Sequence, residues 1–545
     1  MAGDVFADLA RHVDRAFYRH LYPDIAATGL DPVAHWHGHG LAERRRPNVW
    51  FDTAYYLDEY PDIAQARIDP LLHYVRHGRG EGRRARPRQA SALATLAEAR
   101  PAAARPVGYD APANAPILDA TQLAARLIAA MAAHAGPLAR GGIGLLVAAS
   151  HDRYIDVTGG IQLVLADEQA ACAASGTTHL HLAPAIARLC LADTVDPPGL
   201  LQVTLDGVFQ GLVPAAAAVE AIAAVAAAMP ERPRRFAVHS PLGHRTDALR
   251  ALAEACGPDA VYWLHDHTSL CEGFTLLRND LEACHAPPAG SMACRICVYG
   301  AGRAEHQARL RALFDAVPFH VLAPSRPTLD LWLARAGLPF ASARVCEPAT
   351  LAAPEHHAGA AATDAARRDD GPLRVAFLGY PLPHKGWPLF LDLATALALD
   401  PGAAPLKLYH FAARDALRPM DAVTSVAVRV GAGARLAAVE ALARHAIEAV
   451  IVASPWPETF SFVAHEAVAG GARVLALEAG GNVAAMVRRH GAGRVFPTGD
   501  DLLDHLLSGR AGEEIRAARP PARPMLLPGQ GSLGFLHALL GADAR

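Results

Sequence analysis

The sequence lacks a large excess of charge of either sign, and this absence excludes one class of function. Its 545 residues contain 51 Lys and Arg and 54 Asp and Glu, which gives a formal net charge of −3. A protein that coats nucleic acid needs a strongly positive surface. We therefore expect no nucleic-acid partner. The chain is also too long for a single core, and its length predicts about three or four domains.

Long hydrophobic runs are missing as well. The most apolar stretch, residues 214–229, consists mostly of alanine and contains Glu220. Alanine adds little transfer free energy, so this stretch predicts a helix of a water-soluble domain and no membrane span. Residues 1–17 contain acids and no apolar core, so they do not predict a secretory signal. We expect a location in the cytoplasm or at the inner face of the cytoplasmic membrane.

Cysteine is scarce, and its distribution is uneven. Eight cysteines in so long a chain do not suggest a secreted disulfide scaffold. Four of them nevertheless fall within the segment 265–297: Cys271, Cys284, Cys294 and Cys297. Four thiolates suit a tetrahedral structural zinc ion, and the Cys-x2-Cys step is a usual chelate spacing. Two disulfides or packed free thiols are the alternatives.

A repeat is present near the start of the chain. The segment AFYRHLYPDIAATGLDP recurs as AYYLDEYPDIAQARIDP at a constant offset of 38 residues, so that Tyr18 matches Tyr56 and His35 matches His73. A fixed period with matched turn residues predicts duplicated helical units. Two such units bury little surface alone, so we expect them to pack on each other or on a partner.

Two Ala-rich stretches with few large apolar side chains predict linkers, at 88–138 and 353–371. The predicted parts of the chain are then a repeat module, two α/β domains and a tail that returns to the first α/β domain as a helix. Their bounds are 1–87, 139–352, 372–510 and 511–545.

Short apolar runs alternate with helical stretches in both α/β parts. The runs of the first part are 143–149, 178–182, 236–240, 261–266, 296–299 and 321–325, and those of the second are 374–379, 406–411, 426–430, 449–454 and 472–477. This pattern predicts α/β architecture with two facing Rossmann-like parallel-sheet domains. Ligands of such sheets bind at the carboxyl ends of the strands, which would face the cleft between the domains.

The segment IVASPWPETFSFVAHEAVAGG carries the most specific pattern. A buried strand ends at Ser454, and Glu458 and Glu466 follow with seven residues between them. One acid would lie in a loop and the other on the next helix. The start of that helix would point its free N–H groups into the cleft, which suits an anion.

This segment resembles the Glu-x7-Glu signature of the family 4 retaining glycosyltransferases, which have the GT-B fold. The resemblance implies that Glu466 holds the two ribose hydroxyls of a nucleotide and that Glu458 lies near the transferred sugar. Backbone N–H groups of Thr459, Phe460 and Ser461 would meet the diphosphate. The alternative is a pair of ordinary acids on a βαβ helix.

A second segment, LRVAFLGYPLPHKGW, is similar to the opening strand of the same family's donor domain. The resemblance implies that Gly379 lets the backbone approach the phosphates and that Lys385 neutralises them. The family often has an arginine directly after the strand glycine, but this chain has Tyr380. One expected phosphate clamp is therefore missing.

The first α/β part offers candidates for the acceptor side. Gly159 and Gly160 precede a predicted helix and are similar to a glycine pair that lies near the donor phosphate in the family; a simple turn is the alternative. His265 lies at the end of the predicted strand 261–266 and matches a family histidine that faces the transferred sugar. A buried structural histidine is its alternative.

The resemblance implies a retaining, metal-independent glycosyltransferase. Its donor would be a nucleotide-diphosphate sugar, and its acceptor would be a glycan or a lipid-linked molecule of bacterial surface polysaccharide synthesis. No catalytic cofactor is expected, and a structural zinc ion would be the only metal. Two other functions stay open at this stage: a non-catalytic scaffold that binds through its repeats, and a nucleotide-sugar epimerase.

Overall fold

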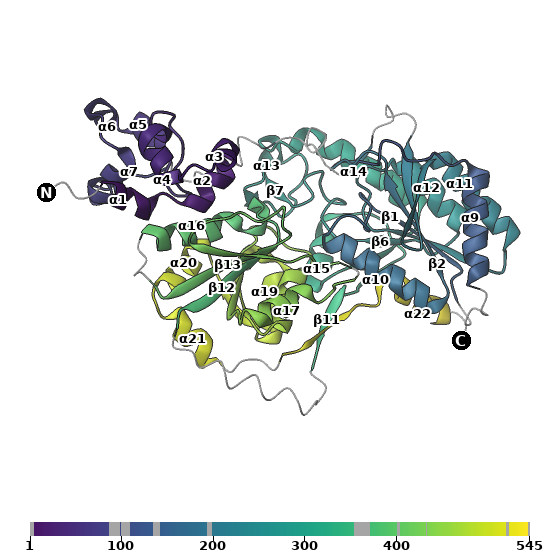
Figure 1. The fold of residues 1–545 in the computed structure, drawn as a ribbon. Coiled ribbons are helices and arrows are strands. Elements are labelled where there is room, and N and C mark those ends of the chain that lie inside the picture. Colours follow the sequence, from purple (N-terminus) through teal and green to yellow (C-terminus); the bar gives the residue numbers. More distant parts are fainter. Residues whose placement is uncertain are drawn as a thin grey trace.

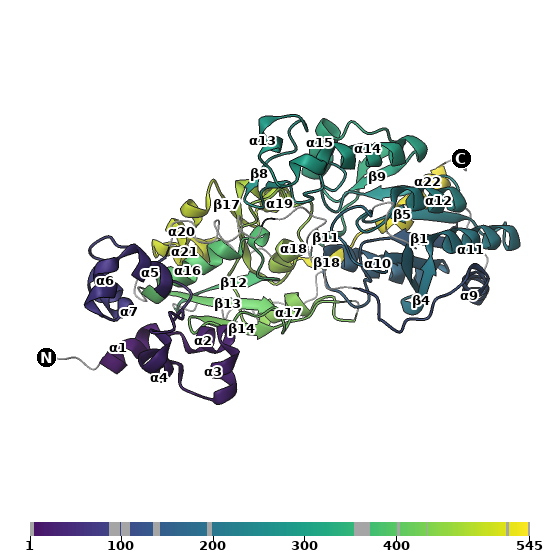
Figure 2. The same ribbon diagram turned by 90° about the horizontal axis from the view of Figure 1, so that it is seen from above.

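The computed structural model describes residues 5–86, 99, 110–134, 142–192, 199–353, 371–399, 404–431, 433–518 and 523–542. Two α/β domains lie next to each other, and a small helical module at the start of the chain packs beside the second domain (Figures 1 and 2). Among the described helices, none is both long enough and apolar enough to cross a bilayer.

The first domain is built on an eight-stranded sheet. Its strands, in spatial order, are β10 (Ser342–Val345), β9 (His320–Ala323), β6 (Val261–Trp263), β5 (Arg234–Val238), β1 (Leu145–Ala149), β2 (Thr178–Pro184), β3 (Leu200–Leu205) and β4 (Val208–Pro214). The six strands from β10 to β2 pair in parallel, whereas β3 and β4 form an antiparallel hairpin at the edge.

Helices cover both faces of this sheet because its strands are apolar on both sides. One face packs on α9 (Ala120–Ala133), α11 (Ala215–Ala228), α12 (Thr246–Cys256), α14 (Gly300–Ala316) and α15 (Arg326–Arg335). The other face packs on α10 (Gly160–Ser175) and α22 (Gly531–Ala542).

The second domain is built on a six-stranded sheet in which every pairing is parallel. The order is β14 (Val423–Ala427), β13 (Leu406–Ala412), β12 (Leu373–Leu378), β15 (Ala449–Val452), β16 (Arg473–Leu477) and β17 (Gly493–Phe496). One face packs on α17 (Ala437–Arg444), α18 (Phe462–Ala469) and α19 (Asn482–His490), and the other on α16 (Trp387–Leu399), α20 (Gly499–Leu507) and α21 (Ala511–Ala517).

The chain crosses between the two domains twice, and the two crossings pair with each other. Strand β11 (Ala349–Ala352) leaves the first domain, and β18 (Met525–Pro528) returns to it as its antiparallel partner. Helix α22 follows β18 and buries Leu533, Phe535 and Leu536 against the first sheet. The last helix of the chain therefore belongs to the core of the first domain.

The N-terminal module repeats its contacts at the same offset as its sequence. Its helices are α1 (Val5–His12), α2 (Arg15–Leu21), α3 (Pro23–Thr28), α4 (Pro32–His35), α5 (Thr53–Glu59), α6 (Pro61–Ala66) and α7 (Pro70–His73). The Tyr18 hydroxyl lies 3.0 Å from His35 Nδ1, and the Tyr56 hydroxyl lies 2.9 Å from His73 Nδ1. Both tyrosines are buried, so their role here is in the core of the module.

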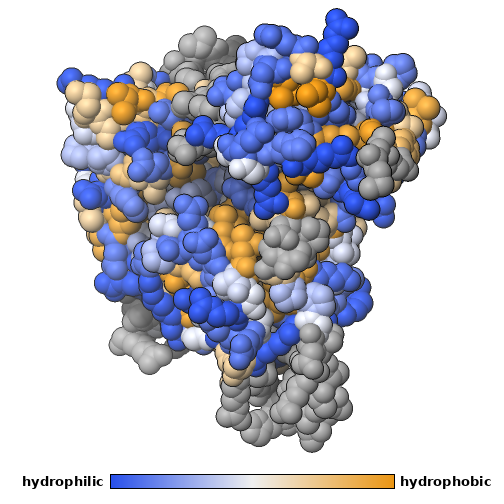
Figure 3. Space-filling view, turned by 90° about the vertical axis from the view of Figure 1, so that its left-hand side faces the viewer, coloured by the Kyte–Doolittle hydropathy of each residue, from blue (hydrophilic) through white to orange (hydrophobic). Residues whose placement is uncertain are grey.

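The module docks on the second domain, on the side away from the first. The Asp421 carboxylate accepts a hydrogen bond from the Arg15 backbone N–H at 2.9 Å, and Leu399 on α16 packs against the module's core. The face that Figure 3 shows, on this side of the molecule, is mostly hydrophilic, with hydrophobic residues in small separate areas.

Three sequence predictions differ from the structure. Residues 296–299 form no strand, because they belong to the loops and short helix (Met292–Arg295, α13) of the cysteine-rich segment. The predicted linker 88–138 contains helix α9, whose Leu123, Leu127 and Met131 recur at helical spacing and enter the core. The hairpin β3–β4 was not predicted. Most of the linker 353–371 lies outside the described residues.

Candidate functional site

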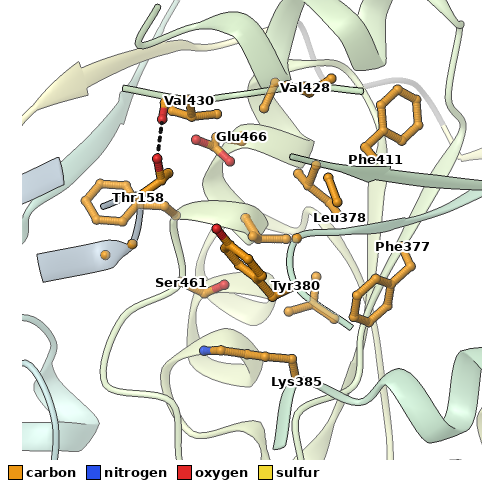
Figure 4. Close-up of a pocket in the computed structure, with 18 of the residues that line it drawn as sticks. Thr158, Phe377, Leu378, Tyr380, Lys385, Phe411, Val428, Val430, Ser461 and Glu466 are labelled. Atoms are coloured by element: carbon orange, nitrogen blue, oxygen red, sulfur yellow. Dashed lines mark hydrogen bonds between the residues drawn. The ribbon is translucent and has the colours of Figure 1, made fainter. Parts of the chain in front are cut away.

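A cavity of about 250 Å³ lies at the carboxyl ends of the second sheet's strands, with the first domain as its far wall. Thr158, Gly159, Gly160 and Leu163 line it from the first domain. The Thr158 hydroxyl donates to the Val430 carbonyl at 3.2 Å and so connects the domains at its rim (Figure 4). Two Rossmann-like domains thus face each other across a shared site. This is the GT-B arrangement, and it confirms the predicted fold class.

Glu466 is a buried acid in the wall of this cavity. It lies on α18 with 3% of its surface exposed, and its Oε1 atom has no hydrogen-bond partner in the described structure. Burial raises the pKa of Glu466 to about 7, although the nearby Arg435 opposes the shift. A buried acceptor without a donor costs free energy, so this carboxylate is suited to receive hydroxyl groups of a ligand.

Arg435 stands between Glu466 and the first domain. Its Nη1 atom lies 3.6 Å from Glu466 Oε1 without forming a hydrogen bond, and its Nε atom lies 3.5 Å from Asp167 Oδ2 on α10. Its guanidinium also covers the Phe462 ring. Arg435 therefore links the acid of the second domain to a helix of the first.

Lys385 and Glu458 form an ion pair in the same cavity. Lys385 Nζ donates to Glu458 Oε1 at 2.9 Å, and the Ser454 hydroxyl donates to the same oxygen at 2.8 Å. Glu458 is buried, whereas Lys385 is 39% exposed and lies over the Trp456 ring. The ammonium keeps further N–H groups that can meet an anion. In Figure 4, Tyr380 lies between Lys385 and Glu466.

Two glycines shape the loop that carries Lys385. Gly379 has a φ of +109°, and Gly386 has a φ of +84°, both conformations that L side chains rarely adopt. A Cβ atom on Gly386 would lie 2.4 Å from the Ala453 carbonyl oxygen. The close approach of the two loops at the cavity floor thus requires glycine at position 386.

The start of α18 also faces the cavity. Ser461 caps the helix, since its hydroxyl accepts from the Ala464 N–H at 3.2 Å, and Phe460, Ser461 and Phe462 line the cavity wall. The helix N-terminus carries unpaired N–H groups and a partial positive charge. This end of the cavity is electrically suited to a phosphate.

A second cavity, of about 470 Å³, adjoins the first and shares Lys385, Glu458 and the Gly159–Gly160 turn with it. Its other lining residues are more polar and include His151, Asp152, His265, Asp266, Thr275 and Thr459. The two cavities form one continuous site, apolar at the Glu466 end and polar at the His265 end.

The first domain holds the loop before α18 from the opposite side. His267 Nε2 lies 2.9 Å from the Pro457 carbonyl oxygen, and the Thr459 hydroxyl donates to the His265 carbonyl at 2.5 Å. The Thr328 hydroxyl donates to the Thr459 carbonyl at 3.2 Å. These contacts fix the positions of His265 and Glu458 relative to each other across the domain boundary.

Comparisons with known proteins give only distant likenesses. No family model matches the sequence, and no curated protein matches it. Among solved structures, the chain is similar to a sucrose-phosphate synthase from Thermosynechococcus elongatus, with 16% identity, 73% of this chain and 98% of that chain covered, and a TM-score of 0.43. The chain is also similar to HepE from Anabaena in complex with UDP and glucose. That comparison has 14% identity, covers 73% of this chain and 94% of that chain, and gives a TM-score of 0.39. Likeness of this degree carries no functional information.

The structure brings the predicted ligand-binding residues together. Gly159, Gly160, Gly379, Lys385, Glu458, Phe460, Ser461 and Glu466 line the first cavity, and His265 and Thr459 line the second. Lys385 and Glu466 border the same cavity, so one ligand can reach both. Their individual roles stay predictions.

The predicted zinc site does not fit the side chains as they are arranged. All four cysteines are free thiols that line one narrow cavity. The buried Arg303 guanidinium donates to Cys294 Sγ at 2.8 Å, so it contacts the sulfur atom that a metal ion would bind. Among the described residues, no group of three or more His, Cys, Asp or Glu is placed to hold a metal ion. This arrangement agrees with packed free thiols, one of the alternatives.

Sequence reasoning missed two kinds of residue. Arg435 has no local pattern that marks it, because its importance comes from reaching Asp167 in the other domain. Glu168 and His239 are buried on α10 and after β5, where an acid and a histidine give no periodic signal. His239 lies near the carboxyl end of the predicted strand 236–240, and this position was the one available clue.

Proposed function

We propose that the protein transfers a sugar from a nucleotide-diphosphate sugar to a hydroxyl acceptor. The observation that carries the proposal is the shared cavity in which the buried Glu466 carboxylate has an unpartnered oxygen while Lys385 and a helix start border the same space. A carboxylate accepts two neighbouring hydroxyls at once, as a ribose presents them. The cation and the helix start suit the diphosphate that a nucleotide sugar carries next to its ribose.

The base and the ribose would occupy the Glu466 end. Apolar side chains there can cover the faces of a base: Phe377, Leu378, Phe411, Val428 and Val430. Two hydrogen bonds from ribose hydroxyls to Glu466 would satisfy its free oxygen, each worth about 1.5–3 kcal/mol because the acceptor is charged.

The diphosphate would lie between Lys385 and the start of α18. An ammonium about 4 Å from a phosphate oxygen gains roughly 4 kcal/mol at an effective dielectric constant near 20. Such a group stabilises the charge that develops as the leaving phosphate departs. Tyr380 replaces the arginine expected at this place, so Lys385 carries a larger share of that stabilisation.

The transferred sugar and the acceptor would share the polar cavity with Glu458 and His265. The resemblance to family 4 supports a retaining reaction, in which the acceptor attacks on the side of the departing phosphate and that phosphate takes the acceptor's proton. This chemistry needs no protein nucleophile and no divalent cation. Positioning of donor and acceptor by the two domains is then the main contribution of the protein. A glycan or lipid-linked acceptor of surface polysaccharide synthesis, reached at the inner membrane face, completes the proposal.

A thermal-shift screen against nucleotide sugars tests this function. A donor present at about 100 times its dissociation constant stabilises the native protein by about 2.7 kcal/mol, which raises the melting temperature. We expect one class of nucleotide sugar to give this shift with wild type. Glu466→Gln should weaken its binding about 100-fold through the loss of charge-assisted bonds.

Two outcomes would contradict the proposal. If no nucleotide sugar shifts the wild-type protein, the cavity does not bind such donors. If the donor binds but neither transfer to an acceptor nor hydrolysis occurs, the protein is a binding scaffold. Glu440→Gln, on the exposed side of α17, is the matched control and should bind the donor as wild type does.

A further inference from the structure

A chain of buried side chains runs from the interior of the first domain to the polar cavity. The Oε1 atom of Glu168, on α10, lies 3.1 Å from His239 Nε2. His239 Nδ1 lies 3.0 Å from His265 Nε2, and His265 lines the cavity. Glu168 and His239 are almost fully buried, at 2% and 1% exposure. Neither touches the cavity, so the proposed function assigns them no role.

The direction of these hydrogen bonds follows from the charge of Glu168. Burial alone would raise the pKa of Glu168, but the imidazoles of His239 and His179 hold it well below its usual range. An ionised carboxylate only accepts, so His239 must carry its proton on Nε2. A ring that carries its one proton on Nε2 has an acceptor at Nδ1, so His239 Nδ1 accepts from His265 Nε2–H. The remaining nitrogen, His265 Nδ1, is left as an acceptor.

The crossing-back helix α22 fixes the inner end of this chain. The Ser532 backbone N–H donates to Glu168 Oε2 at 3.1 Å, and the Ser532 hydroxyl accepts from Trp263 Nε1 at 2.9 Å. The Trp263 ring stacks on the His265 ring at 4.7 Å between centroids, with an angle of 6° between the planes. Both the proton position and the ring plane of His265 are thus set by residues behind it.

We infer that Glu168 and His239 are positioning residues, which fix the tautomer of His265 so that its Nδ1 atom accepts a hydrogen bond from a sugar hydroxyl in the polar cavity. This inference rests on the proposed function for the identity of the ligand. The Glu168 charge favours a proton on His265, but burial outweighs it and lowers the pKa of His265 well below its usual range, so this ring serves as a hydrogen-bond acceptor.

Glu168→Gln tests the direction of the chain. The glutamine oxygen must still accept from the Ser532 N–H, so its NH2 group faces His239 and forces that ring to accept on Nε2. His239 would then donate from Nδ1, His265 would accept on Nε2, and the His265 proton would move to Nδ1. The histidine that meets the sugar changes from acceptor to donor, while no side chain in the cavity is replaced.

The readout is nitrogen NMR of histidine-labelled protein without ligand, with the His265 signal assigned from its loss in His265→Gln. We expect the Nε2–H tautomer of His265 in wild type and the Nδ1–H tautomer in Glu168→Gln. An Nδ1–H tautomer in wild type would overturn the inference, and this measurement stands even if Glu168→Gln fails to fold. It is also independent of whether the donor has been identified correctly.

Kinetics gives the second readout. Glu168→Gln should lower kcat for transfer about 10- to 100-fold and leave the dissociation constant of the nucleoside diphosphate alone unchanged, because the nucleotide contacts lie in the other domain. His306→Gln removes another buried histidine of the first domain, whose Nε2 donates to the Thr268 carbonyl, and it should change neither value. An equal loss of kcat in both variants would reduce Glu168 to a structural role. Failure of donor binding in wild type would instead contradict the proposed function.

Discussion

Glu466 and Glu168 are two buried acids that approach the same interdomain site from opposite domains, and their surroundings differ in one respect. Glu466 has an oxygen without a hydrogen-bond donor, and its pKa is raised to about 7 by burial. Glu168 is equally buried, but it has two histidines and a backbone N–H as neighbours, and its pKa is held well below the usual range.

The difference shows that partners, and not burial, decide what a buried acid can do. Burial removes water from both carboxylates, which costs free energy. At Glu168 the protein itself offsets that cost with donors, which makes the group part of a rigid framework. At Glu466 the nearby Arg435 offsets only part of that cost, so a ligand with hydroxyl donors gains what the fold leaves unsatisfied. Substituting each acid by its neutral isostere separates the two cases.

The largest expected effect is a loss of stability in Glu168→Gln. The substitution removes two charge-assisted hydrogen bonds, from His239 and from the Ser532 N–H, each worth about 1.5–3 kcal/mol, and it reverses the bond to His239. We expect a clearly lower melting temperature of the first domain at pH 7. Unchanged stability would mean that Glu168 is not an ionised member of the cluster.

Glu466→Gln should change the stability of the protein in the opposite direction and raise it. The folded-state pKa of Glu466 is raised from 4.5 to about 7, so ionisation in the folded protein reduces stability as the pH rises through this window, by roughly 3 kcal/mol in full. The variant should therefore melt above wild type at pH 8 and close to it at pH 4.5. A pH-independent difference would show that Glu466 titrates normally.

Lys385→Ala examines the partnered acid of the second domain, Glu458. Loss of the ammonium leaves Glu458 with the Ser454 hydroxyl alone and removes the cation proposed to meet the diphosphate. We expect kcat/KM to fall about 100-fold, which corresponds to about 2.7 kcal/mol. Lys407 on β13 is the only other lysine of the sequence, which makes Lys407→Ala a matched control. Equal activity of Lys385→Ala and wild type would show that Lys385 does not contribute to the reaction.

The smallest effect concerns an acid at the surface. The exposed Asp421 carboxylate accepts from two backbone N–H groups at the start of α2 and so holds the repeat module. Exposed hydrogen bonds contribute little, so Asp421→Ala should lower stability by less than about 1 kcal/mol. Faster proteolysis of the module with unchanged donor binding is the expected result. Loss of donor binding would show that the module supports the site directly.

The sequence predicted most of the second domain's site, because the residues concerned lie in local patterns. Glu458, the start of α18 and Glu466 follow one strand within a single loop and helix, and Lys385 follows another strand of the same sheet. Parallel strands bring such loops to one edge, so spacing alone places them together. The hairpin β3–β4 and helix α9 were missed because the same apolar residues fit more than one element.

The first domain's contribution could not be predicted in the same way. The Glu168–His239–His265 chain joins a helix, the ends of two strands and, through Ser532, the last helix of the protein. None of these residues is near another in the sequence, and none is marked by a local pattern in its own element. The zinc prediction for the cysteine-rich segment lacks support for a related reason, since its spacing suits zinc but Arg303 reaches Cys294 from helix α14.

By itself, the sequence determined the two parallel-sheet domains, the repeat module and the loops that can meet a nucleotide, since these depend on hydrophobic periodicity and on residues close together in the chain. Only the tertiary structure decided which buried charges are satisfied and which are left for a ligand. A hydrogen bond depends on a few tenths of an ångström between distant segments, and packing of the two domains and the returning helix α22 sets those distances.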